Sequence, residues 1–174
     1  MPGLMPTKST RTGRRMQSRS GGRMAAMNWL FKEEPSNYSF DELVKDKRTI
    51  WSGVKNPLAQ KHLHAVKGGD RIFYYHTGNE KAVVGIAKAL KGAYADPQDA
   101  TGKLAVVDVG PVRKLARPVT LAEIKADPAF KTFPLVRISR LSVMPVTDAE
   151  WKRIEATSAE IPEESPRPRR SRRS

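Results

Sequence analysis

Large aromatic side chains lie beside polar residues at several points of the 174-residue chain. Trp29, Trp51 and the pair Tyr74-Tyr75 are on or next to strand-like segments. The run Gly53-Val54-Lys55-Asn56 brings a glycine turn and a side-chain amide to the start of an expected helix, whose first N–H groups lack partners within the helix. Ser139-Arg140 follows a basic run. Aromatic faces stack on bases, while amide and guanidinium groups hydrogen-bond base edges, so these residues favour a flat ligand such as a base.

The same residues also have an ordinary structural interpretation. Each tryptophan, taken alone, can be a core residue, and a glycine before a helix is usually only a turn. A base is therefore favoured as the ligand only by the combination of Trp, Asn, His and Arg in a basic chain.

Most signatures of catalysis are missing. The chain contains no Cys and matches neither the Gly-rich dinucleotide fingerprint, nor the Walker A loop, nor the Gly-x-Ser-x-Gly elbow. His62 and His64 are spaced i, i+2, which does not put both on one helix face, and His76 has no evident companion ligand. Glu33 and Glu34 are adjacent and would point to opposite sides of a strand. We therefore predict no catalytic residue, no metal site and no cofactor.

An alternative is an enzyme that acts on a nucleotide or small molecule in the same pocket, with His76 as its acid–base group. A third possibility is a protein-interaction domain whose basic ends serve only solubility. Turnover assays distinguish the first alternative, and nucleic-acid binding after removal of the ends distinguishes the second.

The net charge of +14 is unevenly distributed. It divides into +6 for residues 1–26, +6 for residues 27–158 and +2 for residues 159–174. Both ends lack apolar periodicity and are expected to be disordered. Residues 1–26 fit a nucleic-acid-binding arm, an organelle transit peptide, or sequence upstream of the true start, since Met24 and Met27 precede the first folded-type segment. No apolar run approaches the length that spans a bilayer, so a soluble protein is expected.

The elements that must position the aromatic and polar residues can be outlined from local patterns. Asn56-Pro57 predicts a helix start, because Asn caps well and Pro suits the first helical position. Capping boxes begin at Ser39, Thr120 and Thr147. Strand-like runs cover residues 28–32, 49–51, 71–77, 82–90, 104–109, 112–115 and 142–146. The pattern predicts an α+β fold, a small mixed or antiparallel barrel of about five to six strands with short helices in the connections.

Five stretches of this chain form a recognisable set: Asn28-Trp-Leu-Phe-Lys-Glu-Glu-Pro-Ser36, Trp51-Ser-Gly-Val-Lys-Asn56, Gly69-Asp-Arg-Ile-Phe-Tyr-Tyr-His-Thr-Gly78, Val83-Val-Gly-Ile86 and Leu135-Val-Arg-Ile-Ser-Arg-Leu-Ser-Val143. In this order they resemble the EVE domain, a family of the PUA-like superfamily. The resemblance implies a PUA-like pseudo-barrel over residues 27–157, between terminal segments 1–26 and 158–174. The family often carries Ser where Glu33 stands, and an aromatic and an arginine after Asn56 where this chain has Pro57-Leu-Ala-Gln-Lys61.

The resemblance further implies a non-catalytic module that binds DNA or RNA carrying a modified base, such as a modified cytosine, flipped into an aromatic pocket. By position, the resemblance implies that Trp29 and Trp51 form walls of this pocket and that Asn56 hydrogen-bonds the edge of the base. The full set of residues expected at the ligand is Trp29, Lys32, Trp51, Gly53, Val54, Lys55, Asn56, Tyr74, His76, Ser139 and Arg140. Lys32 and Lys55 would favour the nucleic-acid backbone, and His76, Ser139 and Arg140 would supply polar contacts. We expect no membrane partner, a monomer, and a bacterial-type cytoplasmic protein, or a nuclear or organellar one in a eukaryote.

Overall fold

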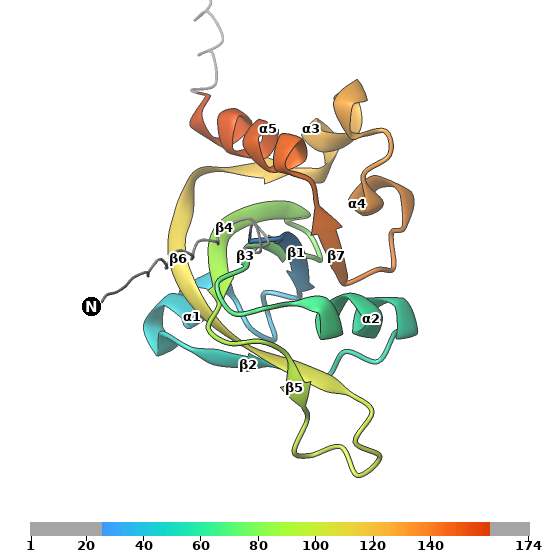
Figure 1. Cartoon of the computed structure of the whole chain (residues 1–174). Helices are drawn as coiled ribbons and strands as arrows, with labels where there is room; N and C mark the ends of the chain where they lie inside the picture. The colour runs from blue at the N-terminus through green and yellow to red at the C-terminus, as the bar shows by residue number, and fades with distance from the viewer. Residues whose placement is uncertain (1–25, 161–174) are drawn as a thin grey trace, which may run out of the picture.

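A curled sheet of seven strands forms the centre of the computed structural model, which describes residues 26–160 (Figure 1). Of the predicted terminal segments 1–26 and 158–174, residues 1–25 and 161–174 lie outside the described residues. The strands are β1 (Asn28–Glu33), β2 (Thr49–Trp51), β3 (Arg71–His76), β4 (Ala82–Ala89), β5 (Tyr94–Ala95), β6 (Ala105–Thr120) and β7 (Val143–Val146). The helices are α1 (Phe40–Asp46), α2 (Pro57–Ala65), α3 (Leu121–Ala126), the 3₁₀ helix η2 (Pro128–Phe130), α4 (Pro134–Arg137) and α5 (Asp148–Ala159).

The sheet is mixed, with the strand order β2-β6-β4-β3-β1-β7 and the short β5 beside β6. β1 and β3 are parallel, and the other neighbours are antiparallel. Figure 1 shows α5 and α3 above the curled sheet, with α1 and α2 towards its lower part. This arrangement confirms the predicted α+β class and its barrel-like sheet with short helices in the connections.

Alternation along β1 decides which residues share a side of the sheet. Successive side chains of a strand point to opposite faces, so Trp29, Phe31 and Glu33 share one face and Lys32 lies on the other. The parallel register pairs Phe31 with Tyr74, Lys32 with Tyr75 and Glu33 with His76. Of the residues expected at the ligand, Trp29 and Lys32 therefore lie on opposite faces of β1.

Local patterns predicted helix starts more reliably than strand ends. The capping boxes at Ser39, Thr120 and Thr147 are all formed, and the Asn56 Oδ1 accepts a hydrogen bond from the Ala59 N–H at 3.0 Å. The two strands predicted at 104–109 and 112–115 were wrong, because β6 runs unbroken through Pro111. Pro111 lies at a register shift against β4, where a missing N–H is tolerated.

Helix α5 is four residues longer than the predicted end at Glu155. Its last turn is held from outside: Arg117 donates hydrogen bonds to the carbonyl oxygens of Thr157 and Glu160, and Ser158 is buried. Such long-range contacts leave no signal in the local sequence.

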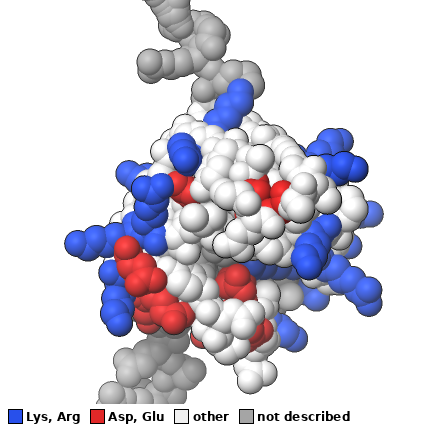
Figure 2. Space-filling model, turned by 90° about the horizontal axis from the view of Figure 1, so that it is seen from below, with Lys and Arg blue, Asp and Glu red and all other residues white. Residues whose placement is uncertain are grey.

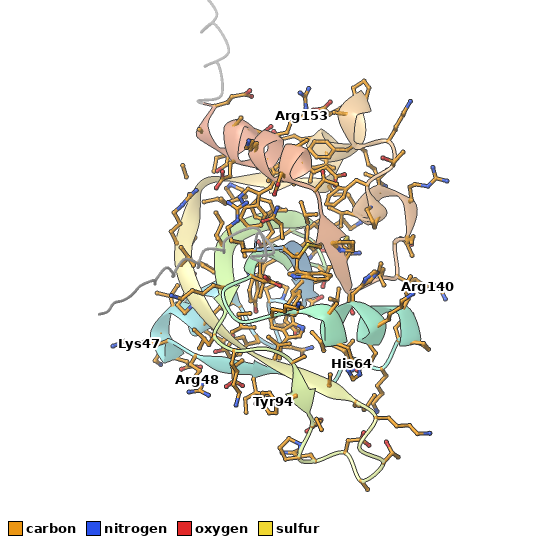
Figure 3. The ribbon with its side chains drawn as sticks, in the orientation of Figure 1. Lys47, Arg48, His64, Tyr94, Arg140 and Arg153 are labelled. Carbon is orange, nitrogen blue, oxygen red and sulfur yellow. The ribbon has the colours of Figure 1, made fainter. Side chains whose placement is uncertain are left out.

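A buried carboxylate links β6 to the edge of the fold and makes stability depend on pH. Asp108 is fully buried, its Oδ1 accepts a hydrogen bond from the Tyr94 hydroxyl at 2.6 Å, and its Oδ2 accepts one from the Arg48 guanidinium (Figure 3). Burial opposes ionisation, but these two hydrogen bonds and the charge of Arg48 outweigh it and lower the pKa of Asp108 below its ordinary 3.8.

A carboxyl group whose pKa is lower in the folded state stabilises the fold above the unfolded pKa. That contribution is lost as the pH falls below about 4 towards the lower folded value. In thermal melts followed by circular dichroism, we expect Asp108→Asn to have a lower melting midpoint than the wild type at neutral pH. We also expect acid to lower the midpoint of Asp108→Asn by less than it lowers the midpoint of the wild type. Equal falls in the two proteins would contradict this role of Asp108.

Candidate functional site

A small pocket opens beside Trp51, at the end of β2. Its volume is about 170 Å³, and it is lined by Glu33, Tyr38, Thr49, Ile50, Trp51 and Ser52. An apolar cavity of roughly 150 Å³ in another protein is known to hold a benzene ring. The Trp51 pocket is therefore of a size that suits one aromatic ring.

Aromatic rings pack behind Trp51 and fix its orientation. The centroid of the Trp51 ring is 5.1 Å from that of Phe31 and 5.4 Å from that of Tyr74. The planes of the Trp51 and Tyr74 rings meet at 87°, an edge-to-face arrangement. Trp51 is 5% exposed and Tyr74 is fully buried. Tyr74 therefore supports the wall of the pocket from behind.

Two side chains of β3 fasten the loop that carries Tyr38. The Tyr74 hydroxyl donates to the Tyr38 carbonyl oxygen, and the Phe40 N–H donates to the His76 Nε2 at 3.0 Å. Burial, with the charge of Glu33 as a smaller cause, raises the pKa of Tyr74 well above its ordinary value, so its hydroxyl remains a donor. His76 and Tyr74 thereby position the ring of Tyr38 at the pocket.

Both ring nitrogens of His76 are engaged. With Nε2 accepting from Phe40, the neutral ring carries its proton on Nδ1, which lies 2.9 Å from the Glu80 Oε2. This arrangement suits a positioning side chain. A general acid or base would need one of these nitrogens to face a substrate.

Glu33 places a carboxylate in the pocket. One of its oxygens, Oε1, accepts a hydrogen bond from the Glu34 N–H at 2.9 Å. In the described part of the chain this is its one protein hydrogen bond, so the carboxylate retains free acceptor positions. A carboxylate repels phosphate and accepts hydrogen bonds from amino groups, such as N4 of cytosine.

Backbone donors are also available next to the pocket. β2 is the terminal strand of the sheet and pairs only with β6, so its other edge carries backbone groups without ladder partners. The N–H groups of residues 52–55 form no hydrogen bond with any described residue. These donors complement the acceptor atoms of a base edge.

The loop from Gly53 to Asn56 leads from the pocket to α2. Gly53 adopts a positive φ of 78°, which a glycine tolerates best. The buried Val54 accepts a hydrogen bond on its carbonyl oxygen from the Gln60 Nε2 at 2.6 Å. Lys55 and Asn56 are exposed, and Asn56 uses its Oδ1 as the helix cap, which leaves its NH₂ group available to donate a hydrogen bond.

Trp29 lies on the same face of β1 as Glu33 but is not among the residues that line the Trp51 pocket. It is 3% exposed, its ring lies against His62, and its Nε1 donates to the Asp70 Oδ2 at 2.9 Å. Asp70 also accepts from the N–H groups of Met27 and Lys67. This buried carboxylate ties Trp29 to the start of β3.

Lys32 and Ser139 lie together in a second cavity, on the opposite face of β1. The Lys32 Nζ donates to the Ser139 carbonyl oxygen at 2.9 Å. Arg140 is exposed on the loop between α4 and β7, and Figure 3 shows it at the right-hand edge of the molecule. The structure thus brings Trp51, Tyr74 and His76 together and separates Lys32 and Ser139 from them.

The basic residues do not form one continuous patch on the face shown in Figure 2. Lys and Arg side chains lie mainly around its rim, and acidic side chains interrupt them. In residues 26–160 no group of three or more His, Asp or Glu side chains is placed to hold a metal ion. None of the helices in that range is long and apolar enough to cross a membrane.

The polar lining of the Trp51 pocket was not predicted from the sequence. Glu33 was not among the residues expected at the ligand, and Tyr38, Thr49 and Ser52 carried no recognised signal. The alternation of β1 could have placed Glu33 on the Phe31 face. Tyr38 depends on the contacts from β3, which connect residues 36 positions apart in the chain.

The EVE domain family model matches residues 27–157, and the chain belongs to this family. Thymocyte nuclear protein 1 of Gallus gallus is 31% identical, over 84% of this chain and 76% of the relative. Its human counterpart is 29% identical, over 71% of this chain and 70% of the relative.

Solved structures agree with the family assignment and confirm the PUA-like fold predicted from the resemblance. Rpa0253 from Rhodopseudomonas palustris is 44% identical and superimposes with a TM-score of 0.74, covering 76% of this chain and 93% of its own. The human THYN1 protein in complex with 5-methylcytosine-containing DNA is 29% identical, with a TM-score of 0.71, covering 79% of this chain and 100% of its own.

Proposed function

We propose that this protein is a non-catalytic module that binds DNA carrying a modified base, such as a modified cytosine, and takes that base into the Trp51 pocket. The observation that carries the proposal is the ring-sized pocket, in which an aromatic wall and a free carboxylate meet. A relative of the same family has been solved with 5-methylcytosine-containing DNA, which supports the choice of partner. RNA remains the second predicted nucleic acid.

The pocket can compensate for the cost of extruding a base. Removing a base from the stack costs a few kcal/mol. Stacking on one aromatic side chain contributes about 1–3 kcal/mol, and Trp51 supplies that ring. The Glu33 carboxylate accepts from the exocyclic amino group, and the unpaired N–H groups of residues 52–55 donate to the ring's acceptors.

The remaining predicted residues take supporting or peripheral roles in this proposal. Tyr74 and His76 hold the Tyr38 loop, and Trp29 stabilises β1 through Asp70. Lys55 and Asn56 contact the nucleic acid beside the pocket, and Arg140 contacts a phosphate. The engagement of both His76 nitrogens favours a binding module over an enzyme.

A substitution of Glu33 tests the proposal, because 5-methylcytosine and thymine differ at the position that Glu33 would read. The carboxylate accepts from the amino group of 5-methylcytosine and repels the carbonyl oxygen of thymine. We expect the wild-type protein to prefer 5-methylcytosine by about 5- to 150-fold, the equivalent of 1–3 kcal/mol. We expect Glu33→Gln to lose most of this preference, since an amide can donate to the thymine oxygen.

The measurement is fluorescence anisotropy with duplexes that carry either base opposite an abasic position, so that base pairing is the same in both. Glu155→Gln removes the same charge from α5 and is expected to keep the preference. Glu33→Ser introduces the residue that the family often carries at this position and should lower the repulsion of thymine. An unchanged preference in a folded Glu33→Gln protein would refute the role of the pocket carboxylate.

A further inference from the structure

Three lysines converge on the second cavity. The cavity has a volume of about 300 Å³ and lies on the opposite face of β1 from Glu33, with Lys32, Tyr75, Thr77, Lys81, Lys125 and Ser139 among its lining residues. Lys81 and Lys125 also line an adjoining cavity of about 350 Å³. Leucine and valine side chains from α3 and α4 complete the apolar part of its wall.

None of the three ammonium groups has a carboxylate within ion-pair distance among residues 26–160. Lys32 is half-buried, and burial lowers its pKa. Lys81 and Lys125 are exposed, so their repulsion is screened in part, but like charges that line one cavity still disfavour one another. An anion bound between them would remove this repulsion.

Tyr75 contributes a neutral donor at the same place. Its side chain is 3% exposed, and its hydroxyl has no hydrogen-bond partner in the part of the chain that the structure describes. Burial raises the pKa of Tyr75 to about 12, so the phenol keeps its proton. The hydroxyl belongs to a residue that lines the cavity, where it can donate a hydrogen bond to a bound anion.

The hairpin between β3 and β4 holds Lys81 in an unusual conformation. Lys81 has a φ of 45°, in the left-handed region that non-glycine residues rarely adopt. Its carbonyl oxygen accepts from the Leu121 N–H at 2.7 Å, which anchors the hairpin to α3. At the other end of the turn, the Thr77 hydroxyl donates to the Glu34 carboxylate at 3.0 Å. The backbone that carries Lys81 is thus fixed from both sides.

We propose that this cavity binds a phosphate group, whose charge is neutralised by Lys32, Lys81 and Lys125 and which accepts a hydrogen bond from the Tyr75 hydroxyl. The phosphate is taken to be one of the nucleic-acid backbone, and only this choice of source rests on the proposed function. Lys32 and Glu33 are neighbours on β1 that face opposite ways. The strand end therefore separates a side that repels phosphate from a side that attracts it.

Two variants distinguish the contributions of charge and hydrogen bonding. Lys125→Gln removes one cation, so the plot of log affinity against log salt concentration should become shallower by about 0.9 for duplex DNA. Tyr75→Phe removes only a neutral donor, so affinity should fall about three- to ten-fold with the salt slope unchanged. Lys152→Gln, on α5, is the matched charge control and is expected to leave both the salt slope and the phosphate response unchanged.

Inorganic phosphate tests the cavity without DNA. In ¹H–¹⁵N NMR spectra of the full chain, phosphate should shift the backbone amides of residues 75–81 and 139, and the shifts should be weaker in Lys125→Gln and in Tyr75→Phe. Absence of these shifts at high phosphate concentration would overturn the site. If phosphate shifts the amides but Lys125→Gln leaves the DNA salt slope unchanged, the nucleic-acid source is overturned.

Loss of the phosphate site and loss of base recognition have different effects on binding. The lysine and tyrosine variants should weaken binding of modified and unmodified DNA equally. A change in the ratio between the two DNAs is expected only from residues of the Trp51 pocket that contact the modified base, such as Trp51, and a change in the preference for 5-methylcytosine over thymine is expected from Glu33.

Discussion

Trp51→Ala is expected to weaken binding of DNA that carries the modified base by about 5- to 150-fold, the equivalent of the 1–3 kcal/mol that one aromatic stacking contact contributes. The Trp51 ring lines the pocket and packs against the rings of Phe31 and Tyr74. Affinity for unmodified DNA should change much less, because phosphate contacts do not involve this ring. Fluorescence anisotropy with matched modified and unmodified oligonucleotides measures both quantities.

The truncation also leaves a cavity in the aromatic cluster, which can cost roughly 3–5 kcal/mol of stability. Near-ultraviolet circular dichroism should therefore accompany the binding curves, and Trp51→Phe serves as a milder variant that keeps a stacking face. We expect Trp51→Phe to retain most of the preference for the modified base. A folded Trp51→Ala protein that binds the modified base as tightly as the wild type would refute the assignment of the pocket.

Gly85→Ala is expected to be the most destabilising small substitution in the sheet. A Cβ atom on Gly85 would lie 2.5 Å from the ring of Phe40, which is 1% exposed. Overpacking of this kind costs about 1–3 kcal/mol or more. Since the Phe40 N–H binds His76, displacement of Phe40 should also loosen the Tyr38 loop and weaken base binding.

Urea unfolding of the variants measures this effect. Gly92→Ala is the matched control, because the nearest atom to its added Cβ would be at an ordinary 3.8 Å. The double variant Gly85→Ala with Phe40→Leu removes the clashing ring atoms and should recover part of the loss. Equal stability of Gly85→Ala and the wild type would show that the α1–β4 contact adapts without cost.

Local signals in the sequence predicted the helix starts, because a capping box needs only residues three positions apart. They predicted the strands less well, and Gly110-Pro111 was interpreted as a break although β6 continues through it. The continuation depends on pairing with β4, whose register shifts next to the proline because Val112 of β6 is left without a partner there. The strand order, including the parallel pair β1 and β3, also depends on contacts distant in the chain.

The candidate site was predictable where residues are near one another in the sequence. Trp51 and the loop to Asn56 belong to one segment, and their neighbourhood follows from that alone. The Tyr38 loop, held by Tyr74 and His76, and the cluster of Lys32, Lys81 and Lys125 bring together residues from separate elements. Such groupings arise only after the sheet has formed.

The alternation of β1 has a consequence for how this domain tolerates insertions and deletions. Deleting Lys32 would turn Glu33 towards the second cavity and bring Glu34 to the side of the Trp51 pocket, because each residue of a strand faces opposite to the one before it. The second cavity would then lose one of its three lysines and gain a carboxylate, and Glu34 would take the place of Glu33 beside the Trp51 pocket. The strand's length in this segment thus sets the chemistry of two binding surfaces at once, and substitutions should be tolerated there far better than changes in length.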